Sequence, residues 1–330
     1  MSVSSMGWIP DYPDYRDFFL DELLSTHINE IDDPIEELYS RKPLSPFEDL
    51  EKRFMELSDM LYKLKLDEIF SRGPRTRKDL RNLFPPIEHQ GEINSCSAHA
   101  GVALIEYMQK QAFGYHIDAS RLFLYKTART LQGSYGDYGV SLRNTIAAMR
   151  IFGVPPERHW DYIEEKVDDE PSAFCYSYAK EFQTLRYFKL DPPALQSEIR
   201  GDGDKGELLM NRIKCLLDAK IPCMFGFPID DNVVGPNKPT DNGKIPFPTY
   251  MYSLNAGHSV VAAGYDNRVK IQRTDGIEDE GAIIIRNSWG ESWGKEGYGY
   301  LPYTYVKTGL AINFWAILKQ EWVDTIKMGL

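Results

Sequence analysis

Apolar residues recur with helical spacing through much of the first two thirds of the chain. The apolar run 98–105 directly follows Cys96 and predicts a buried helix that ends near Gly114. Ser120 and Ser141 stand at the starts of two further helical patterns, as N-cap residues do. Another helix is predicted over 207–220. The first part of the chain is therefore mainly helical.

Short apolar runs with strand character dominate the last third of the chain. We expect strands at 221–228, 259–265, 269–273, 282–287, 297–303 and 311–318. The polar turn at 274–276 makes the runs on either side of it a hairpin. Helices first and strands later indicate an α+β fold with a helical lobe and a barrel-like sheet lobe, and ligands commonly bind where two such lobes meet.

A separate amphipathic helix is predicted near the N-terminus. Its start is Ser45-Pro46-Phe47-Glu48, with a Ser N-cap, Pro at the first helical position and Glu at the third. The apolar residues follow at spacings of 3 and 4: Phe47, Leu50, Phe54, Leu57, Leu61 and Leu64. The helix should end near Phe70 and must lie on the rest of the chain or on another molecule. Trp8–Asp17, rich in proline, should be extended.

Charge separates this leading part from the rest of the chain. Residues 1–70 hold 17 acidic and 7 basic side chains, so they carry nearly all of the net charge of −11. The basic, helix-breaking stretch Ser71–Lys78 follows, and we place a domain boundary there, with a leading unit at 1–74 and a main domain at 75–330. This charge pattern makes nucleic acid an unexpected partner.

Composition gives the remaining expectations. The 330 residues are 42% hydrophobic, which is typical of a globular protein with a large core, and no apolar run has the length of a membrane span. The start lacks a basic region followed by an apolar core, so we expect a cytoplasmic protein or one exported without a classical signal peptide. Four cysteines and no metal-ligand spacing indicate neither disulfides nor a metal.

Two distant segments carry residues suited to thiol chemistry. Gln90 precedes Cys96 by six positions, and Cys96 would stand at a helix N-terminus, where a thiolate is favoured. Far downstream come His258, before an apolar strand, and Asn287. Cysteine, histidine and asparagine are the set needed for acyl transfer through a thiolate, with the histidine as acid and base.

The motifs around these residues resemble those of the papain-like cysteine peptidases, especially their bacterial branch. The matching residues are Asp79-Leu80-Arg81, Gln90-Gly91, Ser95-Cys96, Gly257-His258, Gly264-Tyr265, Asn287-Ser288-Trp289-Gly290, Trp293-Gly294 and Gly297-Tyr298. Two departures stand out: Ile93-Asn94-Ser95-Cys96-Ser97 replaces the family's common nucleophile motif, and His258 follows Cys96 by more than the usual ~130–150 positions.

The resemblance implies a two-lobed papain-like fold and hydrolysis of peptide bonds in peptide or protein substrates, with no cofactor. Cys96 would be the nucleophile, His258 the base and Asn287 its orienting partner. Gln90 and the Cys96 N–H would bind the oxyanion, and Trp289 would cover the histidine. Gly139 and Gly257 are candidates for substrate binding.

The capped amphipathic helix, the acidic charge and the basic linker of the leading part, together with the resemblance, indicate a zymogen, and we expect a monomer. Residues 1–74 would form an inhibitory prosegment, and the chain from Ile69 to Arg77 would cross near Cys96. Acidification could loosen this prosegment by neutralising its carboxylates.

Other interpretations stay open at this stage. A lone cysteine or histidine is more often a core residue than a catalytic one, and His99, one turn from Cys96, competes with His258. The same fold can also transfer acyl groups to amines or cleave one dedicated isopeptide bond. A binding protein without catalytic activity is the third possibility. Asp11, Asp14 and Asp17 do not match a calcium loop.

Overall fold

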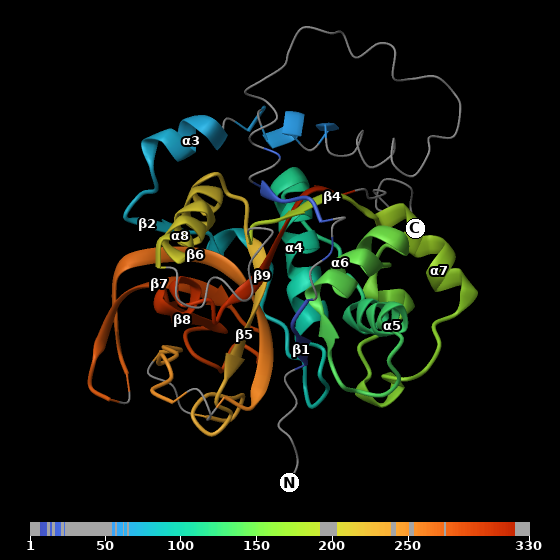
Figure 1. Ribbon diagram of the computed structural model, residues 1–330. Helices are drawn as coiled ribbons and strands as arrows, with labels where there is room; N and C mark the ends of the chain where they lie inside the picture. The colour runs from blue at the N-terminus through green and yellow to red at the C-terminus, as the bar shows by residue number, and fades with distance from the viewer. Residues whose placement is uncertain are drawn as a thin grey trace, which may run out of the picture.

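Two lobes, one helical and one built on a sheet, lie side by side in the computed structural model (Figure 1). The structure describes residues 7–11, 14, 17–20, 23, 55–56, 58–61, 63–64, 66–191, 203–238, 242–250, 254–273 and 275–320. The predicted helix start at 45–48 and most of the apolar stripe after it lie outside these residues. Of that stripe, Leu61 is buried, whereas Leu64 is 42% exposed.

The helical lobe is built on α4 (Cys96–Phe113), α5 (Arg121–Gln132) and α6 (Leu142–Ile151). Gly114 ends α4 in the left-handed conformation, and the hydroxyls of Ser120 and Ser141 accept hydrogen bonds from the N–H groups of Phe123 and Asn144. All three predicted helices are confirmed. The lobe also contains α7 (Ala173–Ala179) and 3₁₀ turns at Glu157–His159, Glu164–Lys166 and Lys180–Phe182.

The described strands of the other lobe form a seven-stranded sheet in the order β4-β9-β5-β6-β7-β8, with β2 also paired to β6. Their bounds are β2 (Arg77–Asp79), β4 (Thr184–Lys189), β5 (Cys223–Ile229), β6 (Ala256–Gln272), β7 (Glu278–Arg286), β8 (Tyr298–Pro302) and β9 (Ile312–Gln320). Every pairing in it is antiparallel. The two strands predicted at 259–265 and 269–273 are one strand, because an irregularity between Asp266 and Lys270 bends β6 without ending it.

Three of the described helices pack on the sheet lobe. These are α3 (Leu66–Arg72), α8 (Gly203–Asp218) and α9 (Thr304–Lys307), and α8 lies over the sheet and packs against both α3 and α9. A 3₁₀ turn at Arg81–Leu83 follows β2. In β2, Lys78 is opposite Tyr265 of β6, well along that strand from His258. The prediction that Ile69–Arg77 crosses near Cys96 is therefore wrong.

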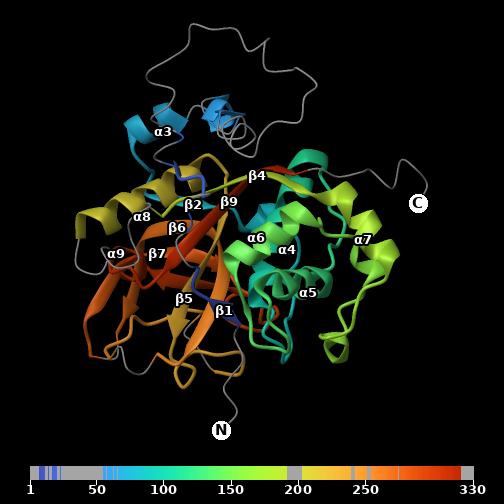
Figure 2. The same ribbon diagram turned by 45° about the vertical axis from the view of Figure 1, so that its right-hand side comes forward.

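A different segment of the leading part lies between the lobes. Strand β1 (Trp8–Ile9) pairs in parallel with β3 (Val140–Ser141) of the helical lobe. Figures 1 and 2 show β1 between the helices of one lobe and β5 of the other. The chain then runs past Asp11, whose carboxylate contacts both lobes, to Phe19, which pairs with Lys189 of β4. We call residues 7–11 the N-terminal segment.

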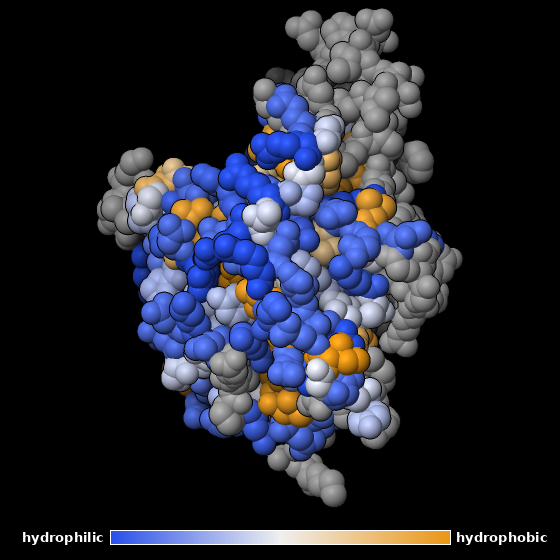
Figure 3. Space-filling model, turned by 90° about the vertical axis from the view of Figure 1, so that its left-hand side faces the viewer, coloured by the Kyte–Doolittle hydropathy of each residue, from blue (hydrophilic) through white to orange (hydrophobic). Residues whose placement is uncertain are grey.

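The outer face of the sheet lobe is mostly hydrophilic, with apolar residues in small separate groups (Figure 3). No described helix has the length and hydropathy needed to cross a lipid bilayer. Within the described ranges, no group of three or more His, Cys, Asp or Glu side chains is placed to hold a metal ion.

Candidate active site

Cys96 is the first residue of α4, and contacts to the helical lobe hold the loop that leads to it. Asn94 donates from its backbone N–H to a carboxylate oxygen of Asp137 (2.8 Å) and from its side chain to the carbonyl of Asp137 (2.6 Å). The hydroxyls of Ser95 and Tyr162 lie 2.6 Å apart. These contacts fix where α4 begins, and hence where the sulfur lies. Asp137 and Tyr162 carried no sequence signal for this role.

The Cys96 thiol is buried, and burial raises its pKa to about 12. The nearby N–H groups of Ser259, Ser97 and Cys96 act in the opposite direction. Burial outweighs them, so the thiol is protonated in this arrangement. The expectation of a depressed pKa is therefore wrong for the chain in this state.

His258, in β6, meets Asn287, which directly follows the neighbouring strand β7. His258 Nε2 lies 2.7 Å from Asn287 Oδ1, and the same oxygen accepts the N–H of Ser288 at 2.8 Å. Because that oxygen is already an acceptor, Nε2 carries the ring proton in the neutral imidazole. Nδ1 is then the nitrogen that can take a proton from a thiol. His258 is next to Ser259, whose N–H lies near the Cys96 sulfur.

Two aromatic rings enclose the imidazole. Trp289 stacks on His258 with 4.5 Å between ring centroids and 23° between planes, and Phe227 meets it edge-on at 6.0 Å. Trp293 packs edge-on against Trp289 in turn. The His258–Asn287 bond is thus shielded from water, which strengthens it. This is the position that the resemblance implied for Trp289.

Gln90 is buried between the two lobes with its amide held at both ends. Its backbone N–H donates to the Ser288 carbonyl at 2.8 Å, and its Oε1 accepts from the Ser288 hydroxyl at 2.7 Å. One N–H of its Nε2 donates to the Ile93 carbonyl at 3.0 Å. Nε2 has a second N–H, so the amide can still donate to a bound oxyanion. Ser288, within the Asn287-Ser288-Trp289 motif, is the residue that sets this orientation.

The N-terminal segment touches both candidate substrate-binding glycines. A side chain at Gly139 would overlap the backbone of Gly7, and one at Gly257 would overlap the Trp8 carbonyl. A side chain at Gly7 would in turn overlap Asn94, two residues before Cys96. The segment therefore lies against the residues next to both Cys96 and His258.

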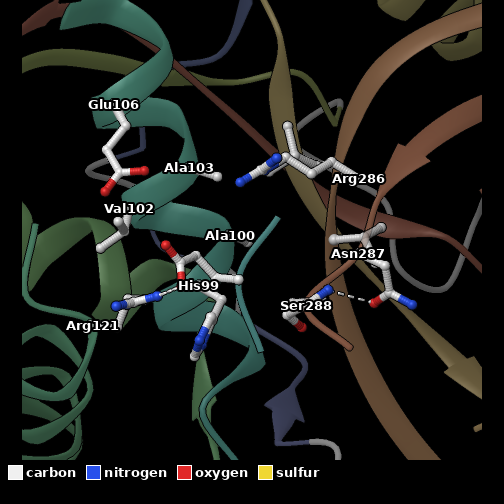
Figure 4. Close-up of a pocket in the computed structure, with 13 residues that line it drawn as sticks. His99, Ala100, Val102, Ala103, Glu106, Arg121, Arg286, Asn287 and Ser288 are labelled. Atoms are coloured by element: carbon white, nitrogen blue, oxygen red, sulfur yellow. Dashed lines mark hydrogen bonds and ion pairs between the residues drawn. The ribbon is translucent and has the colours of Figure 1, made fainter. Parts of the chain in front are cut away.

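His99 is placed differently from His258. Its Nδ1 lies 3.1 Å from the Ser95 carbonyl within α4, and its ring meets Tyr162 edge-on. Burial lowers the pKa of His99 to about 3, so it is neutral. Figure 4 shows it in a polar pocket between the lobes, with Glu106 and Arg121 on the helical side and Arg286 on the sheet side. These contacts are those of a structural histidine.

Comparison with known proteins agrees with this geometry. Residues 245–314 match the family model described as "Papain family cysteine protease". An uncharacterized peptidase C1-like protein of Acanthamoeba polyphaga mimivirus is 31% identical over 240 residues, which are 72% of this chain and 70% of that protein.

Solved structures share the architecture. Xylellain, a cysteine protease from Xylella fastidiosa, has a TM-score of 0.66 and 26% identity, with 97% of each chain covered. Digestive procathepsin L 3 of Tenebrio molitor has a TM-score of 0.52 and 17% identity, with 90% of this chain and 97% of that chain covered, which is a likeness of fold. The chain therefore belongs to the papain family of cysteine proteases, which are hydrolases.

Proposed function

We propose that this protease hydrolyses peptide bonds with Cys96 as nucleophile, His258 as acid and base, and Asn287 as the partner that orients the imidazole. The observation that carries the proposal is the 2.7 Å contact between His258 Nε2 and Asn287 Oδ1 beneath Trp289, next to Ser259 and the start of α4. It leaves Nδ1 of the neutral imidazole to exchange protons with the reacting groups.

The chemistry then follows in two steps. The Cys96 thiol gives its proton to His258 Nδ1, and the sulfur attacks the carbonyl carbon of the scissile bond. His258 returns the proton to the leaving amine as the C–N bond breaks, which leaves a thioester on Cys96. In the second step His258 takes a proton from water, the hydroxide attacks the thioester, and the acid leaves as the thiol is restored. The Gln90 amide and the Cys96 N–H stabilise the oxyanion in both steps.

We further propose that the chain is latent and that residues 1–74 act as its inhibitory prosegment, with Gly7–Ile9 as the part that crosses the catalytic residues. The Gly7 carbonyl accepts the Val140 N–H at 2.8 Å. That carbonyl is therefore held by β3, which supports inhibition rather than cleavage of this peptide bond. Arg77 and Lys78 are in β2, so an activating cut would fall in the coil between Arg72 and β2.

The position of Trp8 supports displacement of the segment rather than a permanent role in the core. Its indole packs over Gly226, but its buried Nε1 has no hydrogen-bond partner among the described residues. An unsatisfied buried donor costs free energy, which lowers the net gain from burying Trp8 at this position. Displacement would also expose Cys96 and remove part of the burial that raises its pKa.

The experiment uses the full chain and a Trp8→Ala variant that weakens the segment. We expect the variant to react with an electrophilic epoxide at Cys96 and to cleave peptide mixtures, with both activities lost in Cys96→Ala. Cys175→Ala is the matched control, because Cys175 is a buried thiol away from the site. Mass spectra of the products with added amines separate hydrolysis from acyl transfer. Labelling without turnover of any peptide, or no labelling at all, would contradict the proposal.

A further inference from the structure

Asp11, at the far end of the N-terminal segment, lies in a buried site whose donors suit a carboxylate. The Asp11 carboxylate is buried; one oxygen accepts the Arg143 N–H at 2.9 Å, and the other accepts Trp315 Nε1 at 2.8 Å. The Lys189 ammonium lies 3.8 Å from the second oxygen. The Asp11 N–H donates to Asn313 Oδ1 at 3.0 Å. The carboxylate thus has two directed hydrogen bonds and a cation.

The three groups named above that contact this carboxylate belong to the main domain. Arg143 contributes an N–H from the first turn of α6, where the helix dipole favours an anion, while Lys189 ends β4 and Trp315 lies in β9. Lys189 and the Arg143 guanidinium both lie over the Trp315 ring, at 5.4 and 5.5 Å from its centroid. The donors therefore come from elements of both lobes.

Charge favours a single carboxylate in this site. The Arg143 guanidinium pairs with Asp17 and lies near Asp14, and the buried Asp191 accepts the N–H groups of Asn313 and Phe314 at 2.8 and 2.6 Å. Asp191 would repel a doubly charged anion. A neutral group would remove one of the carboxylates that offset the charge of the buried Lys189 ammonium, the others being Asp17 and Asp191.

The site lies within reach of the catalytic residues along an extended chain. Trp8 covers Gly226 and Gly257, and Gly257 precedes His258. Asp11 follows Trp8 by three residues, a span of roughly 10 Å in an extended chain. A peptide that binds along the path of the segment would bring one of its side chains to Lys189 and Trp315.

We infer that this is a substrate subsite that selects an Asp or Glu side chain, occupied by Asp11 in the latent chain and by an acidic residue of the peptide substrate once the segment is displaced. The inference rests on the proposed function, since it needs the segment to leave. The inference adds the substrate class to the proposed function. That class is peptides with an acidic residue a few positions from the cleaved bond.

The test uses the full chain with Trp8→Ala and Asp11→Ala, which removes both the indole and the carboxylate of the segment. Fluorogenic peptides carry one Asp, or Asn as the matched neutral residue, at each position in turn. At one position we expect kcat/KM to be roughly 10- to 100-fold higher for Asp, the range of a charge-assisted contact. Adding Lys189→Met should reduce the Asp peptide to the level of the Asn peptide, whereas Lys319→Met, on the exposed side of β9, should preserve the preference.

Equal rates for Asp and Asn peptides at all positions, or a preference that survives Lys189→Met, would overturn the inference and make the site an anchor for the segment alone. A separate binding experiment distinguishes failure of this inference from failure of the proposed catalytic mechanism. If no peptide is cleaved, the Cys96→Ala form of the same variant is titrated with the labelled peptides, and fluorescence anisotropy still measures whether Asp binds more tightly than Asn through Lys189.

Discussion

The indole ring of Trp8 lies directly against the α-carbon of Gly226, so that a side chain at position 226 would overlap the ring. Position 226 is in β5 opposite Ser259, the neighbour of His258. Trp8 can pack at this point because Gly226 has no side chain. The proposed latency can therefore be tested by a substitution at either residue.

Gly226→Ala should expel Trp8 and raise the rate at which iodoacetamide alkylates Cys96 by about tenfold or more, since the loss of a packed Trp is worth several kcal/mol. Trp8→Ala should have a similar effect, and the double variant should gain little beyond either change because both break one contact. Trp8→Phe, which keeps an aromatic ring, is the control. Unchanged alkylation in both single variants would show that Trp8 does not close the site.

Removing the imidazole and removing its partner should differ in severity. His258→Ala should abolish turnover, a loss of ~10³-fold or more, because no other group exchanges the proton. Asn287→Ala should keep part of the activity, since the ring loses its 2.7 Å anchor but remains stacked on Trp289. The measurement is kcat/KM of each variant in the Trp8→Ala background. An Asn287 variant as inactive as the histidine variant would mean that Asn287 does more than orient the ring.

Substitutions of Gln90 and Ser288 should lower kcat more than they change KM. Gln90→Ala removes an oxyanion donor, which is worth ~2.7–4 kcal/mol, so kcat should fall by 10²–10³ with little change in KM. Ser288→Ala leaves the amide in place but removes the hydroxyl that holds its oxygen at 2.7 Å, and a smaller loss in kcat is expected. Ser292→Ala, at an exposed position of the same loop, is the control. A change in KM alone in either variant would contradict the oxyanion role.

Helices whose ends depend on nearby residues could be predicted from the sequence. Short strands that form only by pairing with a distant part of the chain could not. Gly114, Ser120 and Ser141 end or cap helices through bonds to residues a few positions away, so their identity carries the prediction. The 2.7 Å His258–Asn287 contact joins two motifs at neighbouring strands of one sheet, which explains why a pattern of motifs indicates the candidate site.

Strand β1 is the opposite case. Its two residues show no strand periodicity, and its pairing of Trp8 with Val140 joins positions that no local rule connects. The position predicted for Ile69–Arg77 was wrong for the same reason. The pairing of Lys78 with Tyr265 joins residues that are far apart in the sequence, and no local pattern indicates it. Gly139 and Gly257 were predicted to contact an extended peptide. In this structure Gly139 lies against Gly7 and Gly257 lies against Trp8, so contact with a substrate peptide stays a prediction.

The buried carboxyl of Glu106 gives a prediction on stability. Glu106 lies in α4, accepts the Ala119 N–H at 3.0 Å, and has its pKa raised to about 8 by burial, despite Arg286 and Arg121 nearby (Figure 4). The unfolded chain ionises it near ~4.3. Below that pH both states are protonated, and the contribution of this group to folding is fully present. It is lost as the pH rises to about 8, by up to ~5 kcal/mol.

Glu106→Gln keeps an acceptor for Ala119 and cannot ionise. Its melting temperature should therefore match that of the wild type near pH 4 and exceed it increasingly up to pH 8. Glu165→Gln, at an exposed position of the same lobe, controls for the loss of one negative charge and should show no such pH-dependent gain. Thermal unfolding of the three proteins across this pH range is the measurement. A constant difference between Glu106→Gln and wild type would mean that Glu106 is already ionised in the native state at pH 4, with Arg121 and Arg286 outweighing its burial.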